Sequence, residues 1–239
     1  MIPQGKYYAS EEVKEALQSA FSFLLSHQRP GGCLDLTACN FASAPDTAFT
    51  MNAVLSAWWL LEKDEGEETA WLREPMKQLL ESCGEGIMNG GFHTPNHRWA
   101  IAACLKHTAK VCGREDFSKK ADVYLGEGLD INGDGEFAER SAGNYNQVND
   151  DQMIRLFLAT KDPSYLKAAR SNLMMMLSYI DPDGSVFTNN STRQDYGQKV
   201  YSAEIPADVK GIIFNNNGKM QTVDITDGIA DGAWWYSVE

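Results

Sequence analysis

The fold of this chain is decided by the stretch Gly90-Gly91-Phe92-His93-Thr94-Pro95-Asn96-His97-Arg98-Trp99-Ala100-Ile101-Ala102-Ala103-Cys104-Leu105. Its glycines and its proline predict a loop, because Pro95 biases Thr94 away from helical backbone angles. The apolar residues that follow recur at helical spacing. The stretch therefore predicts a loop that delivers several polar side chains to the start of a helix over Arg98–Val111.

Helical patterns continue on both sides of this segment, joined by short polar connections. Ser10 is a suitable cap for a first helix, which ends near Pro30-Gly31-Gly32. Further helices are predicted over Thr47–Lys63, Thr69–Ser82, Asp116–Leu125 and Asn146–Ala159, and from Asp162 to Tyr179. Antiparallel helices of this length favour a mainly α fold, an α/α toroid in the form of an incomplete α/α barrel of antiparallel helical hairpins.

The sequence changes character near Asp181. A turn is predicted at Pro182-Asp183-Gly184, and the residues from Val200 onward alternate in the manner of β-strands between turns. We therefore expect a helical domain over residues 1–198 and a short β segment over residues 199–239.

Composition limits the functions open to the protein. A chain of 239 residues, 43% of them hydrophobic, can bury one sizeable core. Its formal net charge of -12 argues against nucleic acid and membranes as partners, because both demand basic patches. Five cysteines without CxxC spacing indicate neither a zinc site nor a complete disulfide framework. With no secretory leader and no bilayer-long apolar run, the chain as given is expected to be cytoplasmic; a secreted or periplasmic location stays open if a leader precedes it.

The loop before the predicted helix gathers two imidazoles, an amide and a guanidinium. The first backbone N–H groups of a helix lack partners and carry partial positive charge, so polar residues gathered there favour an anion-binding site. The candidates are His93, Asn96, His97, Arg98 and Trp99. The structural alternative is that Asn96 caps the helix and the histidines only pack. Pro95 interrupts the spacing between His93 and His97, which argues against a helical metal site.

Tyr145 is a second candidate, because it stands just before a predicted helix and roughly one helical hairpin after His97. In a toroid both side chains are expected to face one cleft. Neighbouring cations favour the phenolate form of a tyrosine, which would make Tyr145 a usable base. The alternative is a packed ring whose hydroxyl bonds to a backbone carbonyl.

The segment that begins at Asp130 imitates a calcium loop. Asp130, Asn132 and Asp134 supply oxygen side chains at the first, third and fifth positions, and a glycine stands at the sixth. The twelfth position, however, is Ser141, where the bidentate acid should be. Calcium is therefore the one cofactor considered, with a rigid turn as the alternative.

The helical part, from about Val13 to Gly197, resembles bacterial heparinase II/III-like and alginate-lyase-like polysaccharide lyases, which place an α/α toroid before a β-sandwich. The resemblance is carried by Pro95-Asn96-His97-Arg98 and by Tyr145, the tyrosine one hairpin later. Glu139-Arg140-Ser141 and Arg193-Gln194-Asp195 are similar to segments of a less characterised bacterial branch.

This resemblance implies β-elimination at a uronic acid of an acidic oligo- or polysaccharide. Asn96 and His97 would neutralise the sugar carboxylate, so that the C5 proton becomes removable. Tyr145 would take that proton and return one to the departing oxygen. The residues expected to contact the substrate are His93, Arg98, Trp99, Glu139, Arg140 and Arg193.

Two features depart from the family pattern. No histidine occurs after His107, whereas family members obtain a further active-site histidine from the β-sandwich. Residues 203–225 resemble a fragment of a starch-binding module, whose aromatic platform would be Trp234, Trp235 and Tyr236.

Two other functions remain open. A glycoside hydrolase on the same scaffold requires two carboxylates that flank the scissile bond. The available carboxylates are Asp46, Glu139, Asp150 and Asp151. A non-catalytic glycan-binding protein agrees with the absent histidine and with the module-like tail.

Overall fold

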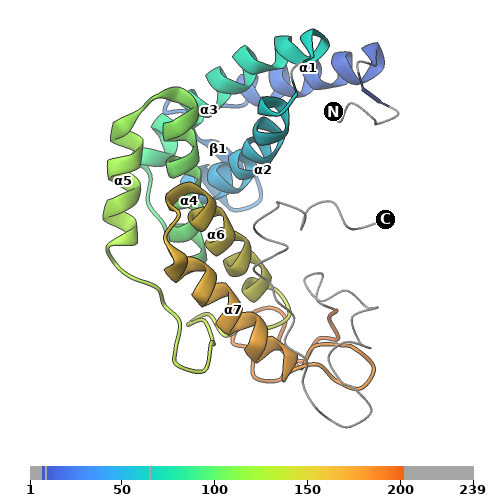
Figure 1. The fold of residues 1–239 in the computed structure, drawn as a ribbon, viewed down its shortest axis with the longest axis vertical. Coiled ribbons are helices and arrows are strands. Elements are labelled where there is room, and N and C mark those ends of the chain that lie inside the picture. Colours follow the sequence, from blue (N-terminus) through green and yellow to red (C-terminus); the bar gives the residue numbers. More distant parts are fainter. Residues whose placement is uncertain (1–6, 9, 65, 202–239) are drawn as a thin grey trace. The chain divides into compact units, whose positions relative to one another are not determined.

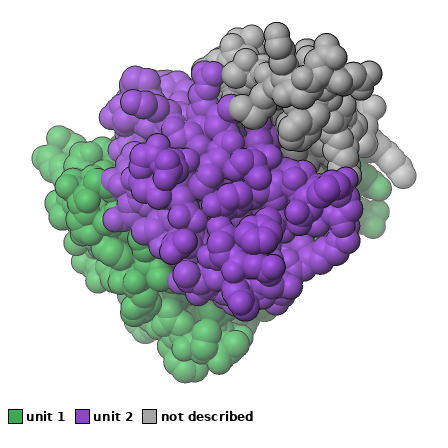
Figure 2. Space-filling model, turned by 90° about the horizontal axis from the view of Figure 1, so that it is seen from below, with its two compact units in different colours: residues 1–128 green, residues 129–239 purple. Residues whose placement is uncertain are grey.

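A computed structural model describes residues 7, 8, 10–64 and 66–201 of the chain. It divides the chain into two compact units, residues 1–128 and residues 129–239 (Figure 2). The described residues are mainly helical, with one two-stranded sheet (Figure 1). The mainly α prediction is thus confirmed, and the boundary between the units falls inside the expected helical domain.

The described part of the first unit contains helices, one 3₁₀-helix and the antiparallel pair of strands. Along the chain these are α1 (Glu11–Ser26), β1 (Leu34–Leu36), β2 (Asn40–Ser43), α2 (Ala44–Glu62), the 3₁₀-helix η1 (Glu67–Leu72), α3 (Arg73–Asn89), α4 (Pro95–Cys112) and α5 (Glu115–Leu125).

Helix α4 forms the centre of the first unit. It packs against α2, α3 and α5, and every residue from Trp99 to Leu105 is 0% exposed. A helix that is apolar on all sides is stable only where neighbouring elements cover all of those sides. The run that decides the fold in the sequence is therefore the buried axis around which this unit packs.

Helix α4 begins at Pro95, about one turn before the predicted start at Arg98. Proline suits the first position of a helix, because the N–H it lacks would have no partner there and its fixed φ is already helical. Thr94 has the expected extended backbone, with φ -139° and ψ 158°. Asn96 and His97 consequently lie in the first helical turn and not in the preceding loop.

The segment that follows α1 packs closely against α3, and glycines on both sides allow the two backbones to approach each other. A Cβ atom on Gly86 would lie 2.5 Å from the backbone nitrogen of Cys33 and 2.7 Å from the carbonyl oxygen of Gly31. A Cβ atom on Gly32, whose φ is +92°, would lie 2.1 Å from the carbonyl oxygen of Ser82. The backbones approach so closely that no side chain fits between them.

The second unit is built on a helical hairpin, α6 (Tyr145–Thr160) and α7 (Pro163–Leu177) (Figure 1). Lys161 adopts the left-handed conformation, with φ 63°, at the end of α6. The Asp162 side chain then accepts a hydrogen bond from Ser164 N at 2.9 Å and caps α7, as predicted. Both predicted helices of this hairpin are confirmed with small changes at their ends.

The rest of the described second unit consists of loops around a small apolar core of Ala142, Met176 and Val186. Val186 forms isolated bridges with Ile180 and Val200 instead of belonging to a strand. Of the β segment expected over residues 199–239, residues 202–239 lie outside the described residues, as does the whole stretch that resembles a starch-binding module. Within the described ranges, no helix combines the length and apolar character required to cross a membrane.

Replacing Gly86 by alanine is expected to lower the free energy of unfolding by about 1–3 kcal/mol, because the added methyl group has to displace backbone atoms. Chemical denaturation measures the effect. Gly31→Ala is the matched control, since no atom lies within 4 Å of a Cβ at that position, and its effect should stay below about 0.5 kcal/mol. Equal destabilisation by the two variants would contradict the close packing of this segment on α3.

Candidate functional site

The loop between α3 and α4 is anchored to α5. The Tyr124 hydroxyl donates a hydrogen bond to the Gly90 carbonyl oxygen at 3.0 Å. The rings of Phe92 and Tyr124 meet edge to face, with their centroids 5.3 Å apart. These contacts fix the backbone that leads into the first turn of α4.

Asn96 and His97 are held differently in that turn. Asn96 is 1% exposed, and its Nδ2 donates to the Thr94 hydroxyl at 3.1 Å. Thr94 occupies the cap position, so Asn96 is not the capping residue of the structural alternative. His97 is half-buried, and its ring meets the rings of Phe49 and His93 edge-on at 6.2 and 6.4 Å. The exposed His93 and the half-buried His97 thus stand together at the start of α4.

Arg98 and Trp99 are buried in the first unit. The Arg98 guanidinium donates from Nη1 to Glu127 Oε2 at 2.7 Å and from Nη2 to the Gly128 carbonyl at 2.8 Å. Trp99 is 0% exposed. Both side chains stabilise the unit itself in this structure, and substrate contacts at these two positions are not supported by their burial.

Tyr145 is the first residue of α6, and two neighbouring residues of the loop after α7 contact its side chain. The guanidinium carbon of Arg193 lies over the phenol ring, 4.4 Å from its centroid. The Gln194 side-chain amide donates a hydrogen bond from Nε2 to the Tyr145 hydroxyl oxygen at 3.0 Å. The Tyr145 side chain thus has one guanidinium over its ring and one amide at its hydroxyl oxygen. Its role as a base remains a prediction.

Glu139 and Arg140 belong to the same region, with different surroundings. The Glu139 side chain is 4% exposed, and Arg193 Nη1 lies 3.6 Å from its carboxylate. Arg140 has a side chain that is 52% exposed and a left-handed backbone with φ 45°. Thr192 donates from its hydroxyl to the Glu139 carbonyl and from its N–H to the Arg140 carbonyl, both at 2.9 Å. Glu139 is therefore close to the guanidinium that covers Tyr145.

A buried carboxylate, Asp195, joins this loop to the start of α6. It accepts hydrogen bonds from the Ser141 hydroxyl at 2.7 Å, the Ser191 hydroxyl at 2.6 Å and the Gly143 N–H at 2.9 Å. Ser141 Oγ in turn accepts from the Tyr145 N–H at 3.1 Å. Burial raises the pKa of Asp195, but the hydrogen bonds from Ser191, Ser141 and Gly143 outweigh it and lower that pKa below its ordinary value. Asp195 thus remains ionised and holds the loop ends together.

The sequence predicted Arg193 as a substrate contact and named Asp195 only within the segment Arg193-Gln194-Asp195, and it assigned no role to Ser141 or Gln194. The contacts between Tyr145 and Gln194 join residues far apart in the sequence, and no local pattern reports them. The one available signal was the segment Arg193-Gln194-Asp195, which was singled out by its resemblance to lyases.

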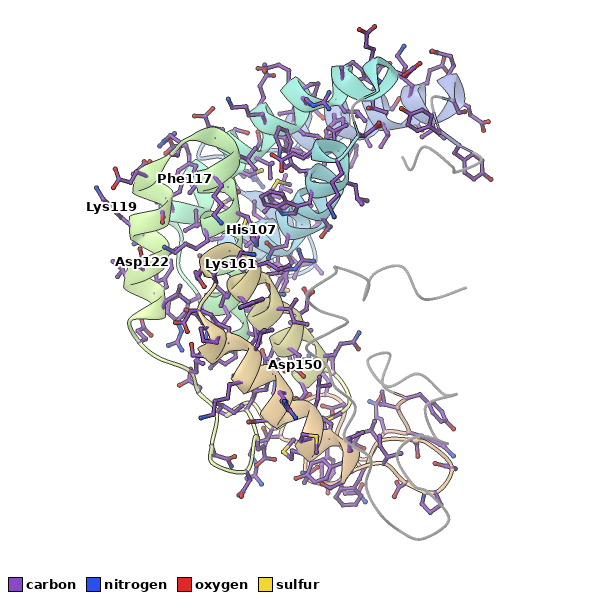
Figure 3. All side chains as sticks on the ribbon, viewed as in Figure 1. His107, Phe117, Lys119, Asp122, Asp150 and Lys161 are labelled. Atoms are coloured by element: carbon purple, nitrogen blue, oxygen red, sulfur yellow. The ribbon has the colours of Figure 1, made fainter. Side chains whose placement is uncertain are left out.

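The other carboxylates are dispersed. Asp46 is hydrogen-bonded to Ser43 at the start of α2. Asp151 accepts from Arg155 Nε at 2.7 Å. Asp150, labelled on α6 in Figure 3, is 0% exposed. Glu139 lies beside Arg193, as described above. The glycoside hydrolase alternative, which needs two carboxylates that flank the scissile bond, therefore remains a prediction.

The calcium-like segment forms a closed turn. The side-chain oxygen of Asn132 accepts hydrogen bonds from the N–H groups of Asp134 and Glu136 at 3.0 and 2.9 Å. Gly135 adopts a left-handed backbone with φ 90°. The described parts of the chain contain no group of three or more His, Cys, Asp or Glu side chains that could hold a metal ion. The geometry favours the rigid-turn alternative at Asp130, Asn132 and Asp134.

The candidate residues thus form two groups, one in each unit. Asn96, His97 and His93 stand at the start of α4, and Tyr145 stands at the start of α6 with Arg193 and Gln194. That the two groups share a cleft remains a prediction. Comparison with protein-family models, curated proteins and solved structures finds no match for the chain.

Asp195→Asn is expected to destabilise the protein by about 1–3 kcal/mol at pH 7, because it weakens hydrogen bonds to a buried carboxylate. Since folding lowers the Asp195 pKa, the carboxylate stabilises the protein above its unfolded-state pKa of about 3.9, and this contribution disappears as the pH falls through the folded-state pKa. The stability difference between wild type and variant should therefore narrow on acidification below about pH 4.

Denaturation midpoints measured across this pH range test the prediction. Asp181→Asn, a change at an exposed aspartate of the same unit, is the control. It should change the stability and its pH dependence much less than Asp195→Asn does. A stability difference that stays constant down to pH 3 would show that Asp195 is not the ionised anchor.

Proposed function

We propose that this chain is a polysaccharide lyase-like protein that cleaves acidic, uronate-containing glycans by β-elimination. The observation that carries the proposal is the environment of Tyr145. Its ring lies under the Arg193 guanidinium, and its hydroxyl oxygen receives a hydrogen bond from Gln194. A tyrosine that acts as a base at a sugar carbon needs such support for its negative charge.

In the proposed reaction, the residues at the start of α4 bind the substrate carboxylate and Tyr145 transfers the proton. Asn96 and His97 bind the uronate carboxylate and stabilise the enolate-like charge that develops when C5 loses its proton. The phenolate oxygen of Tyr145 takes that proton, and the electrons of the C5–H bond form the C4–C5 double bond as the C4–O bond breaks. The protonated Tyr145 then gives the proton to the departing glycosidic oxygen. No group other than these side chains is required to balance the atoms.

We further propose that the hairpins of the two units belong to an incomplete α/α toroid. Helices alternate in direction in such a fold, so α4 and α6 would start at the same rim. Asn96 and His97 lie in the first turn of α4, and Tyr145 is the first residue of α6. That the carboxylate-binding and proton-transferring groups face one cleft is part of this proposal.

An acidic glycan would have to be bound by a few cationic or polar side chains, because the chain as a whole is acidic. The whole chain carries a formal net charge of -12, so long-range attraction does not favour an anionic substrate. Recognition would depend on the imidazoles at the start of α4 and on Arg193, whose side chain is 29% exposed.

Tyr145→Phe is expected to abolish elimination, lowering the turnover number by at least about a hundredfold, because the general base is lost. The assay incubates the protein with a panel of uronate glycans and follows the ultraviolet absorbance of the new C4–C5 double bond. Tyr196→Phe is the control. Tyr196 is 65% exposed and lies in the loop that carries Arg193 and Gln194, and this variant should retain full activity.

The products distinguish the competing functions. New reducing ends without ultraviolet absorbance would show a hydrolase, and retained binding with neither signal would show a glycan-binding protein. Elimination that survives in Tyr145→Phe would contradict the role given to this tyrosine.

A further inference from the structure

We propose that Gln194 is a positioning residue for Tyr145, and that its side-chain amide holds the phenol oxygen in the place from which it acts as a base. The inference rests on the proposed role of Tyr145 as a base, but the hydrogen bond itself can be tested without any substrate. It assigns a function to a residue outside the carboxylate-binding and proton-transferring groups.

The direction of the hydrogen bond is the first observation. Gln194 Nε2 donates to the Tyr145 oxygen at 3.0 Å. An amide N–H can only donate, so the contact strengthens as negative charge develops on the phenol oxygen. A phenolate oxygen has further lone pairs, and one donor leaves room for the proton that arrives from the substrate.

The rigidity of the loop that carries Gln194 is the second observation. The Gln194 carbonyl accepts a hydrogen bond from Gln198 Nε2 at 2.8 Å. On one side of Gln194, Thr192 is bound to the Glu139 and Arg140 carbonyls. On the other side, the buried carboxylate of Asp195 is held by three donors. The backbone of Gln194 is therefore fixed on both sides relative to the start of α6.

The exposure of Gln194 is the third observation. Its side chain is exposed and packs into no core, so its contribution to folding stability is small. The same exposure leaves the phenol oxygen and the amide accessible to a sugar. The orientation of this amide toward Tyr145 is thus better explained by an effect on the hydroxyl than by packing.

Gln194 and Arg193 divide the task between them. Arg193 acts on the ring face from 4.4 Å, and its own charge is partly compensated by Glu139 at 3.6 Å. Gln194 acts on the oxygen itself and is uncharged. Arg193 therefore acts through its positive charge over the ring, while Gln194 fixes the position of the hydroxyl oxygen through a hydrogen bond.

The test uses the full chain with all nine tyrosines replaced by 3-fluorotyrosine, so that fluorine NMR reports each phenol. Loss of one resonance in Tyr145→Phe identifies the signal of residue 145. In Gln194→Met, which keeps the chain length but removes the donor, this signal should shift by more than its linewidth. Gln147→Met, at an exposed position two residues further along α6, should leave it in place.

The isosteric Gln194→Glu variant sharpens the test, because it exchanges the donor for a negative charge. The residue 145 signal should shift in this variant, and by clearly more than in Gln147→Glu, which adds the same charge without contacting the hydroxyl. On a glycan that the wild type cleaves, Gln194→Met should lower kcat about 10- to 100-fold with KM changed less than about threefold.

The outcomes separate the two proposals. A fluorine signal of residue 145 that is unaffected in both Gln194 variants overturns the positioning role, whatever the activity. Shifted fluorine signals with unchanged kcat also overturn it, because the contact then has no catalytic effect. A wild-type protein that eliminates nothing, while its fluorine signals respond as expected, contradicts the proposed lyase function and leaves the hold of Gln194 on the hydroxyl established.

Discussion

The carboxylate of Asp195 is the interaction on which the site in the second unit depends. It is 5% exposed and accepts three hydrogen bonds, from Ser141, Ser191 and the N–H of Gly143. Two of these donors precede α6, and the third lies in the loop that carries Arg193 and Gln194. A buried charge is costly unless all its lone pairs are engaged, so the two loop ends have little freedom to separate. The contacts to Tyr145 follow from this closure.

Cationic groups are few in this acidic chain, and those of the candidate site differ in how firmly they are held. Arg98 is bound to Glu127 and to a backbone carbonyl, and it stabilises the first unit. Arg193 is held more loosely beside Glu139 and remains 29% exposed. A guanidinium whose hydrogen-bonding groups are occupied supports structure, whereas a half-exposed one over an aromatic ring can act on a reacting group.

The sequence predicted most helices to within a few residues, but the one expected over Thr69–Ser82 is a 3₁₀-helix as far as Leu72, followed by α3, which continues to Asn89. The apolar run from Trp99 to Leu105 predicted a buried helix, and that helix is the centre of the first unit. Its start was misplaced by about one turn, because Pro95 restricts the residue before it and not the residues after it. Trp99 was expected at the substrate as part of the motif that carries the resemblance, but its side chain is 0% exposed, since each step along a helix turns a side chain by about 100°.

The site itself could be predicted only in part, for a related reason. Tyr145 was found because it stands beside a glycine-flanked loop at a helix start. The amide that contacts its hydroxyl comes from a loop beyond α7, and the packing that brings them together depends on the conformation of the whole segment between them. Glu139 and Arg193, named separately from sequence, lie side by side for the same reason. Such pairs depend on loop closure, which leaves no periodic signal in the sequence.

The position of Tyr145 as the first residue of α6 has a dynamic consequence. Helix ends open more readily than helix interiors, and a residue in the first turn would ordinarily move with that local opening. Here the Tyr145 N–H is bound by Ser141, whose own hydroxyl is bound by Asp195. Residues outside the helix thereby hold its first residue, so the Tyr145 amide hydrogen should exchange with solvent as slowly as one from the middle of a helix. The backbone that carries the phenol is then held in one place, as the proposed role of Tyr145 as a base requires.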